Sequence, residues 1–403
     1  MRLRPAGIVI EGVLELGREV ELGPDGTILG LGPQTGIPDP YVLSPAFVNA
    51  HSHLEYRGLQ WMSETKPVAP DAQSQELLEG PIDGYFPWIR ALTRIKATQD
   101  LADVARDTHA AARENRQTGV ALIGEHSDRP FSGAALHAVG IGGRIFQEFI
   151  ALGKEGGGLS HREVVSALAR EQSIEFGGPV TVSPHAPWSV DEAHLREFGI
   201  GPDPFSIHVG ETLFEESLFL LGDGPLRPLV YRSWPDWLPP RQFLIDYLAS
   251  LGLMRAGAQW VHGCALQPAD APRLAEAGVA MAHCPRSNLR LQCPAAPVRE
   301  WLEAGVVVGL GMDSPASAGP INQFAEMRAA LDVAAGRGRP LAGEEVWRMA
   351  TSLGAQSLGH ADWSIAEGHR VPLIAIDLDG ANHIDAVIER GSPADVRWID
   401  ARA

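Results

Sequence analysis

An apolar run that ends in a His-Ser-His triplet occupies residues 42–53, VLSPAFVNAHSH. Because alternate residues of a β-strand point to the same face, the imidazoles of His51 and His53 converge on one point if this run is a strand. Imidazole nitrogen is a common ligand of zinc-type metals, although buried histidines also occur without a metal. The case for a metal site at this pair is stronger because five further sites of suitable chemistry follow, each at the end of another strand-like segment.

Short β-rich runs alternate with helical patterns through the middle of the chain, which is typical of βα units with a parallel sheet. We expect strands at 46–52, 119–126, 143–150, 179–185, 204–209, 258–263, 278–283 and 306–312. Helical patterns such as 101–114 and 297–304 fill the crossovers. Eight strands with intervening helices predict an α/β fold, a (β/α)8 barrel with insertions. Both ends of the chain, including 371–377 and 386–391, look like short strands and turns.

Two crossovers, 54–118 and 211–257, are longer than a simple helix requires. Insertions after barrel strands lie at the C-terminal face, where active sites sit, so both segments are candidate lids. The alternative for both segments is that they are additions to the protein surface that do not act as lids. Trp88, in the first insertion, either stacks on a flat substrate or packs in the core.

The composition, with 45% hydrophobic and 21% charged residues, is that of an ordinary globular protein. A formal net charge of −17 argues against nucleic acid or an anionic membrane as partner, because no basic surface is indicated. No segment approaches the roughly 20 apolar residues that span a bilayer. Three cysteines give no disulfide framework. We therefore expect a cytoplasmic protein with a small-molecule substrate, and a homodimer is left open.

Several of the expected strands end in side chains suited to a catalytic divalent metal. Three imidazoles and one carboxylate leave room for a water molecule, whose pKa the metal lowers to about 7. The candidate ligands are His51, His53, His208 and Asp313. Glu211, three residues beyond His208, is placed to shuttle protons without binding the metal. His262, after the sixth strand, is placed to hold or deprotonate the water.

Each of these residues has another reading. A single histidine in a barrel is more often a core or surface residue, and an aspartate at a strand end often caps the next helix, as Asp313 would. Glu211 would then be a solvated loop carboxylate or a first-turn helix acid. Six of the fourteen histidines fall at expected strand ends, however, which is hard to reconcile with scatter.

The order of these motifs resembles the amidohydrolase superfamily. The motifs are His-x-His at 51–53, His-x-x-Glu-Thr at 208–212, His262, His-x-Pro-x-Ser-Asn at 283–288 and Gly-x-Asp-Ser at 311–314. The nearest branch holds the mononuclear-metal deaminases and chlorohydrolases. The resemblance covers essentially the whole chain and implies a small β-sandwich built from 1–44 and 364–403, beside a barrel at 45–363.

The resemblance also implies roles for individual residues. The four candidate ligands keep their role, Glu211 is the proton shuttle, and His262 orients and deprotonates the water together with Asp313. Contacts to the substrate are implied for His185, in the Ser-Pro-His-Ala-Pro-Trp segment, and less uniformly for Ser287 and Asn288. The loop after Asp313 departs from the family pattern, because an asparagine common in relatives is displaced to Asn322.

The lysines favour one metal ion over two. Binuclear members of the superfamily bridge their metals with a carboxylated lysine at a barrel strand end. None of Lys66, Lys96 and Lys154 ends the fourth strand, where His185 lies instead. We therefore expect one divalent ion, with Zn²⁺ favoured for redox-free hydrolysis and Fe²⁺ or Mn²⁺ as alternatives.

The expected reaction is hydrolytic deamination of an amino-purine nucleoside. Within the branch, the chain resembles aminofutalosine deaminases of menaquinone biosynthesis, whose substrate, aminodeoxyfutalosine, carries a benzoate. Candidate partners for that carboxylate are Arg57, Arg232 and Arg286. Alternatives are S-adenosylhomocysteine, methylthioadenosine or guanine deamination, or a chlorohydrolase. A non-catalytic scaffold is the remote alternative, since such proteins typically lose metal ligands that this chain retains.

Overall fold

Eight parallel strands form the centre of the protein, whose computed structural model describes residues 1–64, 66–78, 80–153 and 159–399. One four-stranded sheet has the order β10-β9-β8-β7 and the other the order β11-β12-β13-β14. The strands are β7 (Phe47–Ser52), β8 (Val120–Ser127), β9 (Gly142–Phe149), β10 (Val180–Pro184), β11 (Phe205–Val209), β12 (Ala258–His262), β13 (Ala280–His283) and β14 (Val308–Leu310). All eight expected strands are therefore confirmed.

The two sheets touch at both of their edges. At one seam, Ser52 and Asp313 form a single parallel bridge, and the backbone N–H of Asp313 donates to the His51 carbonyl at 2.9 Å. At the other seam, the backbone N–H of His208 donates to the His185 carbonyl at 2.9 Å. The parallel α/β architecture is thus confirmed, whereas no continuous ladder joins the sheets within the described residues. Closure into a complete barrel stays a prediction.

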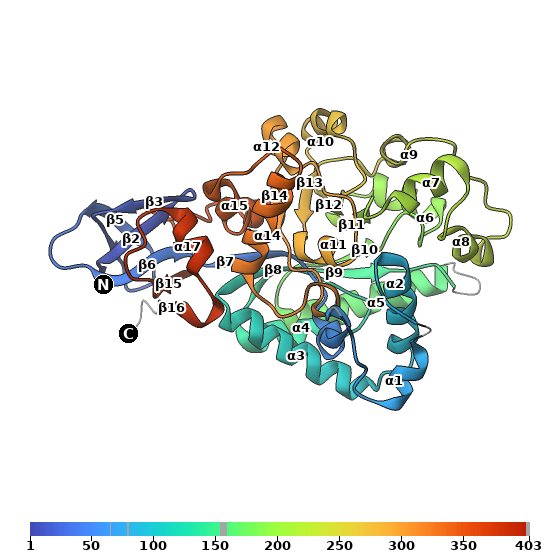
Figure 1. Cartoon of the computed structure of the whole chain (residues 1–403), viewed down its shortest axis with the longest axis horizontal. Helices are drawn as coiled ribbons and strands as arrows, with labels where there is room; N and C mark the ends of the chain where they lie inside the picture. Colours follow the sequence, from blue (N-terminus) through green and yellow to red (C-terminus); the bar gives the residue numbers. More distant parts are fainter. Residues whose placement is uncertain (65, 79, 154–158, 400–403) are drawn as a thin grey trace.

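Helices connect and cover these strands (Figure 1). They are α1 (Ala72–Leu77), α2 (Tyr85–Lys96), α3 (Leu101–Gln117), α4 (Ser132–Val139), α5 (Leu159–Phe176), α6 (Glu192–Ile200), α7 (Leu213–Leu221), α8 (Arg227–Ser233), α9 (Leu244–Ser250), α10 (Ala271–Ala277), α11 (Pro285–Arg290), α12 (Val298–Ala304), α13 (Pro315–Ala318), α14 (Gln323–Gly336), α15 (Gly343–Met349), α16 (Ser352–Ser357) and α17 (Ile384–Arg390). Short 3-10 helices are η1 (Leu54–Ser63), η2 (Pro268–Asp270) and η3 (Pro393–Asp395). In the described part of the chain, no helix has the length and apolar character needed to cross a membrane.

Strands from both ends of the chain lie side by side at one end of the molecule (Figure 1). A five-stranded sheet has the order β16-β15-β6-β2-β3, and a three-stranded sheet the order β1-β4-β5. The strands are β1 (Arg2–Leu3), β2 (Pro5–Ile10), β3 (Val13–Leu16), β4 (Arg18–Leu22), β5 (Ile28–Pro33), β6 (Asp39–Pro45), β15 (Leu373–Ile376) and β16 (Val396–Trp398). Ile8, Val20, Ile28 and Leu373 belong to one buried apolar cluster that both sheets share. The domain boundaries at 44/45 and 363/364 stay predictions.

One terminal segment differs from its expected structure. Residues 386–391 were expected to be a strand, but α17 covers most of them. Ile384, Val387 and Ile388 are buried, and their spacing places them on one face of a helix. His383 caps the helix, because its Nδ1 accepts the backbone N–H of Ala386 at 3.1 Å. A short apolar run fits both the two-residue period of a strand and the 3.6-residue period of a helix. Here the packing of one helical face favours the helix.

Helix α2 of the first insertion is fastened at both ends. The Trp88 indole N–H donates to the Ala316 carbonyl at 3.0 Å. At the other end, the Lys96 ammonium lies 2.9 Å from a Glu55 oxygen and 2.8 Å from an Asp128 oxygen, and it donates to the Tyr56 hydroxyl at 2.6 Å. Because Glu55 is buried, the loss of Lys96 would leave its carboxylate in the interior without a cationic partner, with the Ser127 hydroxyl still donating to it.

Replacement of Lys96 by methionine should therefore destabilise the protein by about 3 kcal/mol or more, the usual cost of removing one partner of a buried ion pair. Urea denaturation followed by circular dichroism measures this cost. Lys66 is exposed, so Lys66→Met is the matched control, and we expect it to stay within about 0.5 kcal/mol of wild type. Equal unfolding midpoints for the two variants would contradict the proposed anchoring.

Candidate active site

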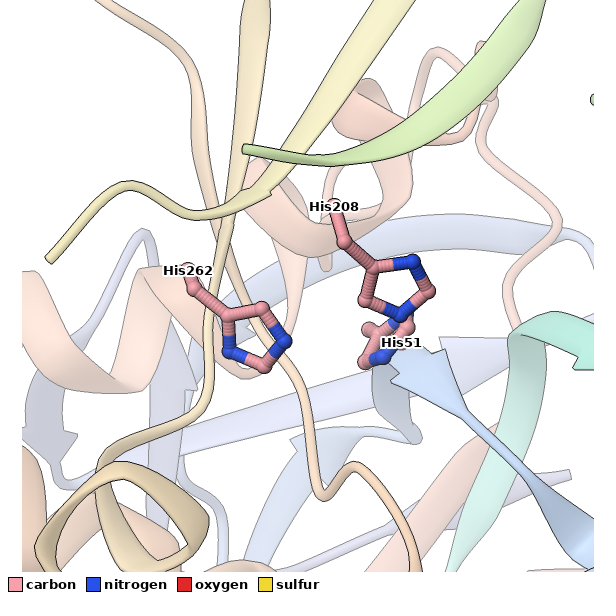
Figure 2. Close-up of side chains that lie close together, drawn as sticks. All are labelled: His51, His208 and His262. Atoms are coloured by element: carbon pink, nitrogen blue, oxygen red, sulfur yellow. The ribbon is translucent and has the colours of Figure 1, made fainter. Parts of the chain in front are cut away.

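The expected metal ligands meet at one edge of the two central sheets. His53 Nε2 lies 3.3 Å from His208 Nε2 and 3.9 Å from Asp313 Oδ1. His51 Nε2 lies 3.6 Å from the same Asp313 oxygen. Figure 2 shows the rings of His51, His208 and His262 turned toward one shared space, each from a different strand. Residues far apart in the sequence are thus brought together as expected.

The backbone at the strand ends is shaped for this convergence. His262 and Asp313 have φ angles of +69° and +50°, in the left-handed region that residues other than glycine seldom adopt. Such conformations persist where the surrounding structure imposes them, and they concentrate at functional sites. Gly311 is required by close packing, because a Cβ atom there would lie 2.8 Å from the Cβ of His51. The Gly-x-Asp motif therefore lets the eighth strand approach the first.

The donor atoms fit one divalent metal ion. Among the described residues, His51 Nε2 is buried and has no hydrogen-bond partner. The Nδ1–H of His208 donates to the His185 carbonyl at 2.7 Å, which leaves the Nε2 lone pair facing His53. Burial and the neighbouring imidazoles hold the pKa of His51 and of His53 well below the usual 6.5, so both rings are neutral, as metal ligands must be.

Overlapping groups of three donors, each within 4.8 Å, connect the cluster. One of these groups is His51, His208 and His262, so the geometry also admits His262 as a ligand beside its expected role as a base. Burial lowers the pKa of His262 to about 4, and the side-chain amide nitrogen of Asn288 lies 3.1 Å from its Nδ1. Which of these residues bind the metal stays a prediction.

No described lysine offers a bridge to a second metal. Lys96 is engaged with Glu55 and Asp128, and Lys66 is exposed. Lys154 lies outside the described residues. The cluster therefore provides a site for a single ion, in agreement with the sequence.

Glu211 is a buried acid rather than a solvated loop carboxylate. It is 6% exposed, and its Oε1 lies 3.7 Å from Nε2 of His262. Burial, reinforced by the nearby charges of Asp313 and Glu215, raises its pKa well above the usual value, although the Tyr85 hydroxyl opposes this effect. A raised pKa favours the protonated form of a carboxyl group and so suits it to donate a proton.

Glu215, which the sequence analysis did not identify, holds the loop that carries Glu211. Its two carboxylate oxygens accept the backbone N–H groups of Gly210 at 3.0 Å and Glu211 at 2.9 Å. Burial raises the pKa of Glu215 to about 7. The fixed loop directs Glu211 toward the cluster.

A cavity of about 60 Å³ opens beside the cluster, and we call it the inner cavity. Its walls include two of the four expected substrate contacts, Trp88 and His185, together with the aromatic ring of Trp188. Ser287 and Asn288 do not line it and instead support the cluster from behind. The Ser287 hydroxyl donates to Asp313 Oδ2 at 2.6 Å. The structure thus favours a positioning role for these two residues.

Two of the candidate arginines are engaged elsewhere. Arg57 forms an ion pair with Glu114 at 2.7 Å, and Arg286 forms one with Glu326 at 3.4 Å. Neither arginine lines the inner cavity. Arg232 lines a neighbouring cavity of about 540 Å³, which shares Ile89 and Trp188 with the inner cavity and which we call the outer cavity.

Two residues at the cluster were missed by the sequence analysis. His126 Nδ1 lies 3.0 Å from His51 Nδ1, and Glu148 Oε1 lies 3.8 Å from His208 Nδ1. His126 ends an expected strand, so the rule that selected the other histidines would have found it. Glu148 carries no such signal, because it lies inside β9 rather than at its end and belongs to no motif.

The chain is similar to a known protein family and to individual proteins. The model of the amidohydrolase family matches residues 240–397. A 5-methylthioadenosine/S-adenosylhomocysteine deaminase of Natronomonas pharaonis is 29% identical over 349 residues, which cover 83% of this chain and 73% of that protein.

Similar solved structures cover the whole chain. An aminofutalosine deaminase of Helicobacter pylori, in complex with methylthio-coformycin, superimposes with a TM-score of 0.77 at 16% identity and is covered over 98% of its length. An adenosine deaminase of Xanthomonas campestris with bound zinc gives 0.76 at 20% identity, with 91% of its length covered. At this level of identity, the superpositions establish the fold alone.

The hydrogen bond from Ser287 to Asp313 yields a test of the positioning role. Ser287→Ala should weaken metal binding about 10- to 100-fold, because groups that orient a ligand commonly have effects of that size. Competition with a chromophoric chelator measures the affinity. The control is Ser357→Ala, which removes a hydroxyl that donates to the Gly354 carbonyl. Unchanged metal affinity in Ser287→Ala would show that the bond has no such role.

Proposed function

We propose that this chain, a hydrolase of C–N bonds other than peptide bonds that matches the amidohydrolase family over residues 240–397, deaminates an amino-purine nucleoside. The observation that carries this proposal is the buried carboxyl group of Glu211, which faces His262 beside the candidate metal ligands. Aromatic walls of the inner cavity, among them Tyr85, Trp88 and Trp188, suit a flat heterocycle. Such a site on a (β/α)8 barrel would lie at the C-terminal rim, where the strand ends meet.

A divalent ion bound there, for which Zn²⁺ fits the imidazole-rich donor set, supplies Lewis acidity that lowers the pKa of a water molecule to about 7. His51, His53, His208 and Asp313 would hold it. The remaining chemistry belongs to the side chains around the inner cavity.

In the first step, the water oxygen forms a bond to the ring carbon that bears the amino group. The C=N π electrons move to the ring nitrogen, which takes the proton of Glu211, while one water proton passes to His262 or Asp313. In the second step, the new O–H returns a proton to Glu211 and the C–N bond breaks. The amine takes its electron pair and the first water proton, and it leaves as ammonia. The products are a ring C=O with an adjacent N–H, and all groups of the protein are restored.

The substrate is proposed more finely as a purine nucleoside with an extended 5′ group, of which aminodeoxyfutalosine is one example. Under that assignment, the protein serves menaquinone biosynthesis. Similarity to a 5-methylthioadenosine/S-adenosylhomocysteine deaminase favours a second candidate with the same chemistry and a different tail. Ammonia release from a panel of aminodeoxyfutalosine, adenosine, S-adenosylhomocysteine, methylthioadenosine and guanine distinguishes these substrates.

Removal of the metal should abolish ammonia release and lower Tm, because an ion that binds only the folded state stabilises that state. Dipicolinate treatment followed by titration with Zn²⁺ tests this expectation, with thermal unfolding and ammonia release measured on each sample. One equivalent per chain should restore both properties. A requirement for two equivalents, or full activity of the metal-free protein, would contradict the single-metal proposal.

Substitution of Glu211 by glutamine should lower the rate of ammonia release by about a hundredfold to ten-thousandfold, the usual contribution of a general acid or base. Metal content, measured by plasma mass spectrometry, should stay at one per chain. Glu216→Gln is the matched control, since Glu216 accepts the backbone N–H of Leu244 and lies outside the inner cavity. A fully active Glu211→Gln enzyme would rule out the proton-shuttle role.

A further inference from the structure

A cavity of about 290 Å³ lies at the N-terminal ends of the central strands, and we call it the basal cavity. Both central sheets contribute to its walls. Arg144 and Phe146 come from β9 in one sheet, and Phe205, Ala258 and Ala280 begin β11, β12 and β13 in the other. The end of α16 completes the lining. The volume is close to the lower end of the range of about 300–1,000 Å³ that is common for small-molecule sites.

The basal cavity is separate from the candidate active site. Strand β12 begins with Ala258, which lines the basal cavity, and ends with His262, which belongs to the cluster of metal donors. Four steps along a strand span about 13 Å. Among the described residues, none lines both the basal and the inner cavity. A ligand in the basal cavity would therefore not touch the groups that act on the substrate.

Arg144 is the one charged side chain among the described residues that line the basal cavity. It is half-buried, and its guanidinium forms no hydrogen bond or ion pair with the part of the chain that the structure describes. Burial lowers its pKa, and the charge of the exposed Asp203 opposes this effect only in part. Because arginine stays charged at physiological pH, this cation has no counterion within the described fold.

A second donor without a partner lines the same cavity. Gln356, in the last turn of α16, is exposed, and its side-chain amide forms no hydrogen bond with any described residue. The other polar side chains of the wall are engaged, since the Ser357 hydroxyl donates to the Gly354 carbonyl and the Gln259 amide donates to the Ala50 carbonyl. No acidic residue lines the cavity within the described ranges.

These groups define the chemistry of a ligand. A guanidinium binds a carboxylate or a phosphate through two parallel N–H···O bonds, which gives directional selectivity as well as charge. Much of the remaining wall is apolar, with Phe146, Phe205, Val279 and Leu358 among its side chains. An inorganic ion would leave these side chains in contact with water, whereas the apolar part of an organic anion would cover them. The lining therefore favours a small organic anion.

We propose that the basal cavity binds a small organic anion, a carboxylate or a phosphate on a compact aliphatic group, with Arg144 as its counterion. The inference goes beyond the proposed deaminase function and does not depend on it. An unpaired charge that is partly removed from water is unfavourable, and an anion that binds only the folded protein would stabilise that state.

Calorimetric titration of the protein, loaded with one equivalent of Zn²⁺, tests this site with butyl phosphate, pentanoate and the uncharged pentanamide. Wild type should bind one of the two anions about tenfold or more tightly than pentanamide, the effect expected of a charged hydrogen bond. The preferred anion distinguishes a phosphate ester from a carboxylate as the ligand. Arg144→Gln should lose the preference. An anion that binds the metal ion would bind both proteins equally, so the difference between them reports on the basal cavity.

Arg170→Gln is the matched control, because Arg170 is exposed, lines a different cavity and carries the same charge. It should bind the anions as wild type does. Equal affinities of wild type and Arg144→Gln, or an equal loss in Arg170→Gln, would overturn the inference. The absence of any preference for an anion over pentanamide would overturn it as well.

Thermal unfolding separates a ligand-binding role of Arg144 from a structural one. Without added anion, Arg144→Gln should unfold within about 2 °C of wild type, because the guanidinium has no partner among the described residues. The preferred anion should raise the Tm of wild type and leave that of the variant unchanged. A larger loss of Tm in the anion-free variant, or an equal rise in both proteins, would contradict the proposal.

Gln356→Glu offers a second variant, at an exposed position where folding is not at risk. Its new carboxylate lies on the cavity wall, where it should repel an added anion and compete for Arg144. The affinity for the preferred anion should fall, whereas the affinity for pentanamide should stay within about twofold. An unchanged affinity for the anion would place its binding site elsewhere.

Discussion

The Nε2 lone pair of His208 constrains the whole site. Its Nδ1–H donates to the His185 carbonyl, so Nε2 can only accept, and Nε2 of His53 lies 3.3 Å from it. A proton on His53 would satisfy this one lone pair but would leave His51 Nε2 without a partner among the described residues. Charging the rings is opposed by burial, which lowers the pKa of all three. One divalent cation would satisfy these donors together, and this is why the cluster is best understood as a metal site.

The same residues also connect the two central sheets. The His51 carbonyl accepts the backbone N–H of Asp313, and the His185 carbonyl accepts both the backbone N–H and the ring Nδ1–H of His208. The contacts that place the candidate ligands are therefore the contacts that hold the seams. A backbone shift at either seam would change the spacing of the donors, so the fold and the chemistry are coupled at these points.

Sequence reasoning succeeded where periodicity fixes geometry. The two-residue spacing of His51 and His53 and the parallel strand ends placed His208, His262 and Asp313 in one cluster before any coordinates were known. Sequence reasoning failed where the packing of side chains in the folded protein determines the secondary structure. Residues 386–391 suit a strand or a helix, and only the burial of Val387 and Ile388 on one face distinguishes the two. Glu148 could not be found, because a carboxylate within a strand looks the same whether it faces a metal site or another polar group.

The role of the first insertion also required the structure, because it depends on both faces of α2 at once. Tyr85, Trp88 and Leu92 follow a helical spacing and line the inner cavity, whereas Phe86, Arg90 and Thr93 follow the same spacing and line the outer one. In a sequence, a helix with one aromatic face and one mixed face looks like any amphipathic helix on a core. Here α2 is a partition between two cavities, with Ile89 on its edge. The hydrogen bond of Trp88 and the ion pairs of Lys96 hold its two ends and so keep the partition between the two cavities in place.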